Sequence, residues 1–153
     1  MTLAKPLMLA AVALAPAAAL SADAKPDAAV QPIVKIVRML EKEGYGPIVD
    51  VSMDDGVWEV EAYKDDASLE LAIDPETGKI LSEHRDDADA RPPKDSLKLS
   101  ELLRKLEKAG HGNVEDVSFE RRYWEVETHQ DGAQHELHVD PKTAKVISDR
   151  LDD

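Results

Sequence analysis

The feature that most constrains this sequence is an internal repeat. When the chain is aligned with itself at an offset of 66 positions, residues 33–87 match residues 99–153 without a gap. A period of this size is typical of a small supersecondary unit that is present in two copies. We therefore expect one structural unit to be used twice. The best matches are residues 50–52 with 116–118, residues 58–61 with 124–127, and residues 74–75 with 140–141.

Each repeat begins with the spacing of an amphipathic helix. Apolar residues recur at i, i+3, i+4 and i+7 from Ile33 and again from Leu99, which indicates one buried helical face. Gly44 and Gly110 follow, where a left-handed residue commonly ends a helix. Apolar and polar residues then alternate through four short runs, which indicates strands. The predicted fold class is α+β, with two tandem repeats, each one helix followed by a four-stranded antiparallel meander.

The two copies differ in the loop of their last hairpin. In the first copy, Pro75 occupies the second turn position and Gly78 stands where a positive φ is convenient. The second copy has Ala144 at the position of Gly78. Because alanine resists a positive φ, we expect this loop either to be strained or to adopt a different turn.

Residues 1–22 have the layout of a secretory signal peptide. Lys5 precedes an Ala- and Leu-rich run that Pro16 interrupts, and small residues follow it. A membrane anchor is the alternative, but the run falls short of the roughly 20 apolar residues that a span needs. We expect cleavage after Ala22 or Ala24, no stable membrane span after cleavage, and a periplasmic or secreted mature protein.

The remaining boundaries follow from the repeat. We assign residues 28–87 to the first repeat, 88–95 to a linker and 96–153 to the second repeat. The linker contains Pro92 and Pro93, which disfavour helix and favour an extended spacer. Such a linker favours some independence of the repeats, but each repeat is small and would bury more apolar surface if the two docked. We expect docking.

Both repeats resemble the PepSY domain. The motifs that carry the resemblance are the helix end at residues 40–46 (Leu-Glu-Lys-Glu-Gly-Tyr-Gly), the strand at 58–61 (Trp-Glu-Val-Glu) and the hairpin at 74–80 (Asp-Pro-Glu-Thr-Gly-Lys-Ile). The second copy departs from this pattern at Ala144 and at Tyr123, where the first has Val57. The family includes propeptide segments of secreted thermolysin-type metallopeptidases. The resemblance therefore implies a role in restraining or chaperoning extracytoplasmic peptidases, and it supplies no catalytic residues.

Composition excludes several classes of function. The chain has 32 acidic and 19 basic side chains and a net charge of -13, which disfavours binding to nucleic acid or to an anionic membrane. It has no cysteine, and therefore no disulfide or thiolate metal site. The serines that match between the copies have no histidine at matching positions, and no glycine-rich phosphate loop is present. We expect no enzymatic activity and no cofactor, although a divalent cation is compatible with the sequence.

The strand pattern places acidic side chains opposite one another. A two-residue turn at 131–132 sets Glu127 opposite Glu136 and Glu125 opposite His138, all pointing away from the apolar face. The first repeat pairs Glu61 with Glu70 in the same way. Like charges in this arrangement are destabilising, so the pattern favours either a solvated acidic face or a face that binds a cation or a basic partner.

Two further groups of residues are candidate binding sites. His129, Glu127 and His138 form the strongest candidate for a metal site, because imidazole and carboxylate are common ligands. A pair of surface histidines without metal is the alternative. Tyr45 and His111 lie between paired glycines in loops and are candidates for contact with a partner, or are solvated loop side chains. Trp58 and Trp124 alternate in phase with valines and are predicted core residues.

Two functions remain open at this point. The first is an exported, non-enzymatic protein-binding module, such as an inhibitor or regulator of extracytoplasmic peptidases, whose partner is another extracytoplasmic protein. The second is a periplasmic cation-binding or sensing module that uses the acidic sheet faces and the histidines. A structural subunit of an envelope complex is a third alternative.

Overall fold

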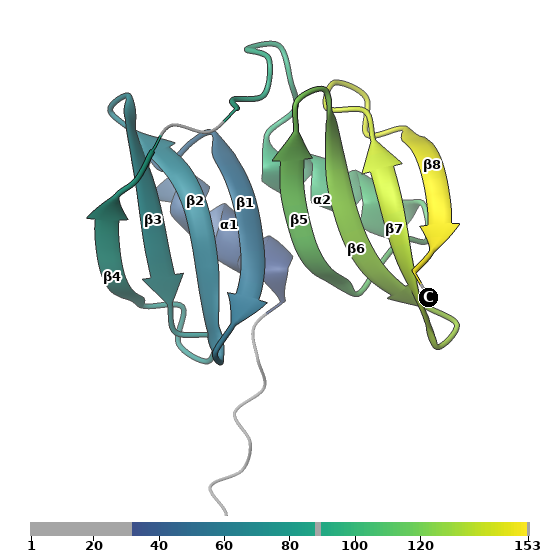
Figure 1. Ribbon diagram of the computed structural model, residues 1–153, viewed down its shortest axis with the longest axis horizontal. Helices are drawn as coiled ribbons and strands as arrows, with labels where there is room; N and C mark the ends of the chain where they lie inside the picture. Colours follow the sequence, from purple (N-terminus) through teal and green to yellow (C-terminus); the bar gives the residue numbers. More distant parts are fainter. Residues whose placement is uncertain (1–31, 88–89, 153) are drawn as a thin grey trace, which may run out of the picture.

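The computed structural model describes residues 32–87 and 90–152, so the predicted signal peptide lies outside the described residues. Each repeat contributes one short helix and four strands (Figure 1). In chain order the elements are α1 (Ile33–Lys42), β1 (Ile48–Asp54), β2 (Val57–Lys64), β3 (Ala67–Ile73), β4 (Ile80–Arg85), α2 (Leu99–Lys108), β5 (Val114–Glu120), β6 (Tyr123–Gln130), β7 (Ala133–Val139) and β8 (Val146–Leu151).

The strands form one sheet. The predicted fold class, α+β with two tandem repeats, each one helix followed by a four-stranded antiparallel meander, is therefore wrong. The sheet has eight strands in the order β4-β3-β2-β1-β5-β6-β7-β8 (Figure 1). The two halves join where β1 pairs antiparallel with β5, with Asp50 opposite Ser118 and Val51 opposite Val117. An isolated meander would leave its first strand as an open edge with unpaired backbone groups. Pairing β1 with β5 removes one such edge from each half.

The join also relates the two copies by approximate twofold symmetry. Asp50 and Ser118 face each other, and the repeat makes Asp116 the equivalent of Asp50 and Ser52 the equivalent of Ser118. Equivalent residues of the two copies therefore meet at this join, which we call the seam. The charged residues of β1 therefore have charged equivalents on β5, as Asp116 is the equivalent of Asp50.

Both helices pack on one face of the sheet and bury their apolar sides. Trp58 and Trp124 are 4% and 1% exposed, which confirms them as core residues. The helices also contact each other, and Ser100 donates from its backbone N–H and its hydroxyl to the Glu41 carboxylate, at 3.1 and 2.5 Å. The helix layer therefore links the two halves as well. The buried helix positions are Ile33, Ile36, Val37 and Leu40 in α1, and Leu99, Leu102, Leu103 and Leu106 in α2.

The described part of the linker contacts both halves. The Arg91 guanidinium lies 3.7 Å from the centroid of the Tyr63 ring and 3.3 Å from the Asp66 carboxylate, both in the first half. The Asp95 carboxylate lies 2.5 Å from the Lys142 ammonium of the second half. The spacer therefore packs against the sheet and helix layers instead of standing free. Across the described ranges, no helix is long and apolar enough to cross a membrane.

The hairpin loop that differs between the copies keeps the same turn. Ala144 has φ 61° and its equivalent Gly78 has φ 72°. The N–H of each donates to the carbonyl of the aspartate four residues earlier, at 2.9 and 2.8 Å. The second copy therefore accepts a left-handed alanine, which is the strained alternative of the two predicted.

This left-handed alanine leads to a testable prediction. Gly78→Ala should lower the free energy of unfolding by about 1 kcal/mol, because the left-handed conformation is unfavourable for a residue with a Cβ. Ala144→Gly should raise it by less, since the Ala144 side chain packs against the core and that contact would be lost. Urea unfolding followed by circular dichroism would measure both changes. Equal stability of the Gly78→Ala variant and the wild type would contradict this account.

Candidate functional site

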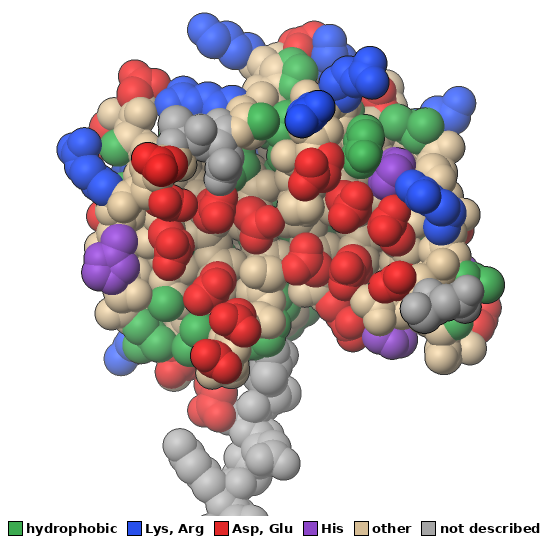
Figure 2. Space-filling view, viewed as in Figure 1, with side chains coloured by type: hydrophobic (Ala, Val, Ile, Leu, Met, Phe, Trp, Pro, Cys, Tyr) green, Lys and Arg blue, Asp and Glu red, His purple; other side chains and the backbone are tan. Residues whose placement is uncertain are grey.

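The face of the sheet opposite the helices is covered with carboxylates. The helices lie behind the sheet in Figure 1, and Figure 2 shows acidic side chains gathered on the face toward the viewer. Strand alternation explains this separation, because Val60 and Val126 point to the helices while the glutamates on either side of each point away. We call this surface the acidic face.

The strand register arranges these carboxylates in two rows, of which the first crosses the seam. The predicted pairs Glu61 with Glu70, Glu127 with Glu136, and Glu125 with His138 are confirmed. Because β1 pairs with β5, the strands of the two repeats are neighbours in the sheet, and the carboxylates of both repeats lie on one surface. One row runs Glu70, Glu61, Asp50, Ser118, Glu125, His138, and a second includes Asp116, Glu127, Glu136 and Arg150.

The most perturbed carboxylate of the acidic face lies at the seam. Burial, and after it the charges of Asp50, Glu127 and Glu125, together raise the pKa of Asp116 to about 7. Water cannot fully solvate this half-buried carboxylate, and its neighbours carry the same charge. The protein therefore holds a repulsive cluster at the centre of its sheet, which a bound cation or basic group would relieve.

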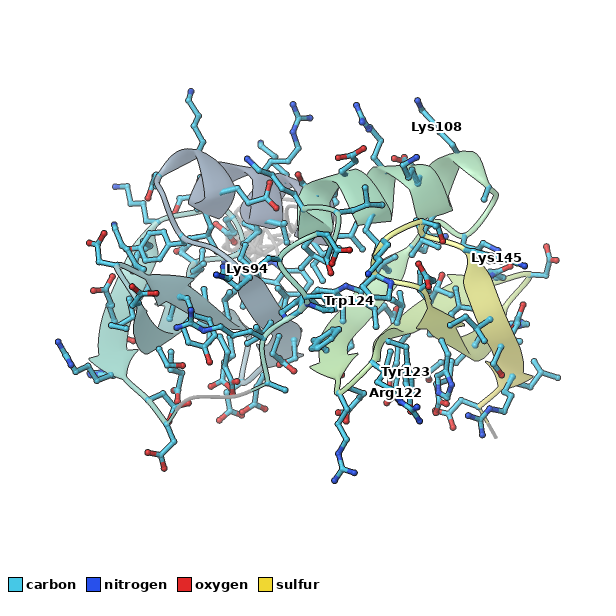
Figure 3. All side chains as sticks on the ribbon, turned by 90° about the horizontal axis from the view of Figure 1, so that it is seen from above. Lys94, Lys108, Arg122, Tyr123, Trp124 and Lys145 are labelled. Atoms are coloured by element: carbon cyan, nitrogen blue, oxygen red, sulfur yellow. The ribbon has the colours of Figure 1, made fainter. Side chains whose placement is uncertain are left out.

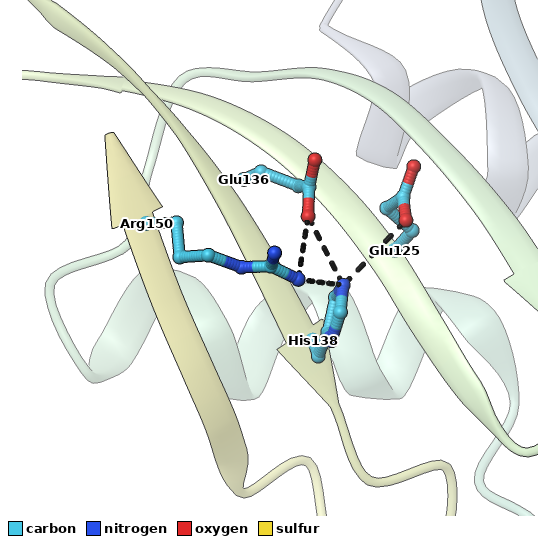
Figure 4. Close-up of polar contacts among 4 residues, drawn as sticks. All are labelled: Glu125, Glu136, His138 and Arg150. Carbon is cyan, nitrogen blue, oxygen red and sulfur yellow. Dashed lines mark hydrogen bonds and ion pairs between the residues drawn. The ribbon is translucent and has the colours of Figure 1, made fainter. Parts of the chain in front are cut away.

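The second repeat contains its own basic side chains on this face, His138 and Arg150 (Figure 4). His138 Nε2 lies 3.1 Å from Glu136 Oε1 and 3.6 Å from Glu125 Oε2. The Arg150 guanidinium reaches the same Glu136 oxygen at 3.2 Å. Burial and the Glu136 charge raise the pKa of Glu125. Figure 4 shows all four side chains converging on one point of the sheet.

The first repeat has the same carboxylates with different residues beside them, since His84, opposite Glu70, stands at the position of Arg150. Its residues equivalent to Glu125 and Glu136 are Glu59 and Glu70. The residue equivalent to His138 is Ala72, which leaves no side chain to reach these glutamates from that position. The two halves of the acidic face therefore differ in the basic side chains placed beside equivalent glutamates.

The residues predicted as metal ligands do not all meet. His138 joins Glu125 and Glu136, whose ligand atoms lie within 4.8 Å of one another and could hold a metal ion. Glu127 instead accepts a hydrogen bond from the Gln134 side chain at 2.9 Å. His129 Nδ1 lies 2.9 Å from Glu115 Oε1, away from that group.

The two residues predicted to contact a partner are both held within the fold. Tyr45 is 6% exposed, and its hydroxyl donates to Glu83 Oε2 at 2.6 Å. This hydrogen bond, more than burial, raises the pKa of Tyr45 to about 12. His111 is partly buried, with Nδ1 2.9 Å from the Gln130 side-chain nitrogen. Contact of either with a partner remains a prediction.

Sequence reasoning missed Asp116 and Arg150 as members of the site. The repeat of Asp-Val-Ser at 50–52 and 116–118 was a signal that these aspartates are equivalent. Only the pairing of β1 with β5 brings them together, and strand periodicity cannot reveal which edges pair.

Comparisons with known proteins identify the repeats. A family model described as peptidase propeptide and YPEB domain matches residues 6–84 and again residues 86–150. No curated protein sequence is significantly similar to this chain. Among solved structures, a candidate lipoprotein from Clostridium difficile 630 is 16% identical, with a TM-score of 0.46, 80% of this chain covered and 93% of that one. A candidate periplasmic protein from Bacteroides eggerthii is 12% identical, with a TM-score of 0.29, 80% of this chain covered and 90% of that one.

Proposed function

Because the chain belongs to the peptidase propeptide and YPEB domain family, we propose that it is an exported, non-enzymatic binding module that regulates an extracytoplasmic peptidase. The family assignment confirms the PepSY resemblance of both repeats. Propeptide domains act on peptidases by binding, which requires a complementary surface and no chemistry of their own. The proposal therefore rests on a surface, and the acidic face is the one we assign.

The observation that supports this assignment is the two rows of carboxylates on the acidic face, one of which crosses the seam. Cross-strand pairs of like charge such as Glu61 with Glu70 cost stability, each by a few tenths to about 1 kcal/mol. Burying Asp116 beside Asp50 costs more, because the charged form of a half-buried carboxylate is disfavoured. A basic surface on the partner would offset these costs on binding and would accelerate association.

The test is inhibition of a purified secreted metallopeptidase of the thermolysin type by residues 23–153. We expect stoichiometric inhibition that weakens as salt rises from 50 to 500 mM, because salt screens the attraction. Glu61→Lys with Glu70→Lys should abolish inhibition. The matched control is Glu101→Lys with Glu107→Lys, which changes the net charge equally on α2. Equal loss in both variants, or no inhibition by the wild type, would refute the proposal.

A second candidate function is cation binding or sensing, and the convergence of Glu125, Glu136 and His138 favours it. A cation bound only by the folded state raises the melting temperature. We expect Zn²⁺ or Cu²⁺ to raise the melting temperature of residues 23–153, and His138→Ala to remove that rise. The same measurement on His129→Ala tests whether His129, the ligand predicted beside Glu127, takes part in metal binding. No shift with zinc, copper or calcium would exclude this candidate.

A further inference from the structure

The segment that precedes α2, residues 91–97, is held against the folded core. The Arg91 guanidinium lies over the Tyr63 ring of the first half, 3.7 Å from its centroid. At the other end of the segment, the Ser96 hydroxyl is buried and Leu97 packs against the core. Figure 3 shows Lys94 of this segment near the middle of the molecule. The segment is therefore anchored at both of its ends.

The repeat contains an equivalent segment before α1. At the offset of 66 positions, residues 25–31 match residues 91–97, and Lys25-Pro26 stands where the second copy has Arg91-Pro92. The chain enters both helices in the same direction, because Pro32 has φ -61° and ψ 145° and its equivalent Lys98 has φ -62° and ψ 144°. A chain that precedes Pro32 as residues 91–97 precede Lys98 would reach the equivalent surface on the second half.

That surface is a groove, which we call the α1 groove. It consists of two hollows of about 580 and 180 Å³, which both border on Pro32, Ile33, Asn113 and Val114. The residues equivalent to its walls line the hollow along which residues 91–97 run. The molecule therefore builds the same apolar wall twice. The apolar wall residues and their equivalents are Ile33 with Leu99, Trp58 with Trp124, and Val114 with Ile48.

Side chains around the α1 groove are more exposed than their equivalents beside residues 91–97. Tyr63 is buried beneath Arg91, whereas the side chain of its equivalent His129 is 43% exposed. Phe119, which borders on Ala90, is 8% exposed, whereas its equivalent Met53 is 39% exposed. Within the part of the chain that the structure describes, the α1 groove therefore lacks the cover that its equivalent has.

The charge of the α1 groove is complementary to the start of residues 25–31. Lys25 stands at the position of Arg91, and His129 at the position of the ring that Arg91 covers. Glu115 Oε1 lies 2.9 Å from His129 Nδ1, so an ammonium over this ring would be next to that carboxylate. The carboxylates that line the groove are Glu115, Asp116 and Glu127.

We propose that residues 25–31 dock into the α1 groove of their own chain, as residues 91–97 do on the equivalent surface. Lys25 pairs with Glu115, and Val30, the equivalent of Ser96, packs on the apolar wall. The repeat selects this occupant, because residues 25–31 have the equivalent sequence and join the groove directly at Pro32. A segment of the same chain also binds at a high effective concentration, which a separate peptide or a second copy does not have.

Thiol labelling measures this docking, because the chain has no cysteine and a single introduced one is a unique probe. In residues 23–153, we expect Met53→Cys to react at least fivefold more slowly than Leu81→Cys, which lies on an exposed edge strand. Val30→Asp should raise the rate of Met53→Cys at least fivefold, because it places a charge against the apolar wall. Leu151→Asp, a matched change at an exposed position of β8, should leave the rate unchanged.

Charge reversal tests the ion pair in the same assay. Lys25→Glu should also raise the rate of Met53→Cys, and adding Glu115→Lys should restore the slow rate. Three results would overturn the proposal: equal rates with and without Val30→Asp, no restoration by Glu115→Lys, and protection that increases between about 1 and 100 µM protein. The last would mean that the segment enters the groove of a second copy. The assay uses no peptidase, so its outcome is independent of the function proposed above.

Discussion

Asp116→Asn should raise the melting temperature by several degrees at pH 8 and leave it nearly unchanged at pH 5. The folded protein holds the pKa of Asp116 at about 7, against an ordinary value of 3.8. Between these values the folded state binds more protons than the unfolded state, so stability falls as pH rises through this window. At pH 8 the substitution removes a half-buried charge that Asp50 and Glu127 repel, whereas at pH 5 the folded protein has already neutralised it.

Thermal unfolding at the two pH values, followed by circular dichroism, measures this difference. The control is Asp152→Asn, which removes an exposed carboxylate for which no such gain is expected. An equal gain from Asp116→Asn at pH 5 and pH 8 would mean that the substitution acts through packing and not through charge.

Leu71→Ala should lower the free energy of unfolding by about 2–5 kcal/mol and should destabilise both repeats together. Leu71 is 0% exposed in β3, and truncation of a buried leucine leaves a cavity. Because β1 and β5 are paired in one sheet and the helices also contact each other, the halves should unfold as one cooperative unit. Leu137→Ala, at the equivalent position of the second repeat, should have the same effect.

Urea unfolding of two single-tryptophan backgrounds separates the halves. In the Trp124→Phe background, the fluorescence of Trp58 reports the unfolding of the first repeat. In the Trp58→Phe background, the fluorescence of Trp124 reports the unfolding of the second repeat. We expect Leu71→Ala to shift the midpoint equally in both. A shift seen by Trp58 alone would show that the repeats unfold independently, as tandem meanders without a shared sheet would.

The parts of the structure that were predictable from sequence depend on contacts close in the chain. The spacing of Ile33, Ile36, Val37 and Leu40 repeats on one helical face, so that face is buried whatever it packs against. The two-residue turn at 131–132 sets the register that places Glu127 opposite Glu136. These features follow from backbone geometry over fewer than about a dozen residues, and the pattern in each repeat supports the other.

The burial of Tyr45 was not predictable in this way. Its position between Gly44 and Gly46 is typical of an exposed loop, but the structure brings Glu83 of the edge strand β4 to its hydroxyl. Lys64 then covers the ring, with its ammonium 4.0 Å from the centroid. The partners lie 19 and 38 positions away in the chain, a separation over which local patterns carry no information.

The sequence by itself determined the repeat, the helical and strand segments, the alternation that puts carboxylates on one face, and the family. Only the tertiary structure decided that the two meanders share one sheet, that Asp50 and Asp116 meet at the seam, and that Glu83 reaches the Tyr45 hydroxyl. The physical reason is that periodicity defines which side of a strand or helix is apolar. Which edge pairs with which depends instead on how all the elements together bury apolar surface and satisfy backbone groups.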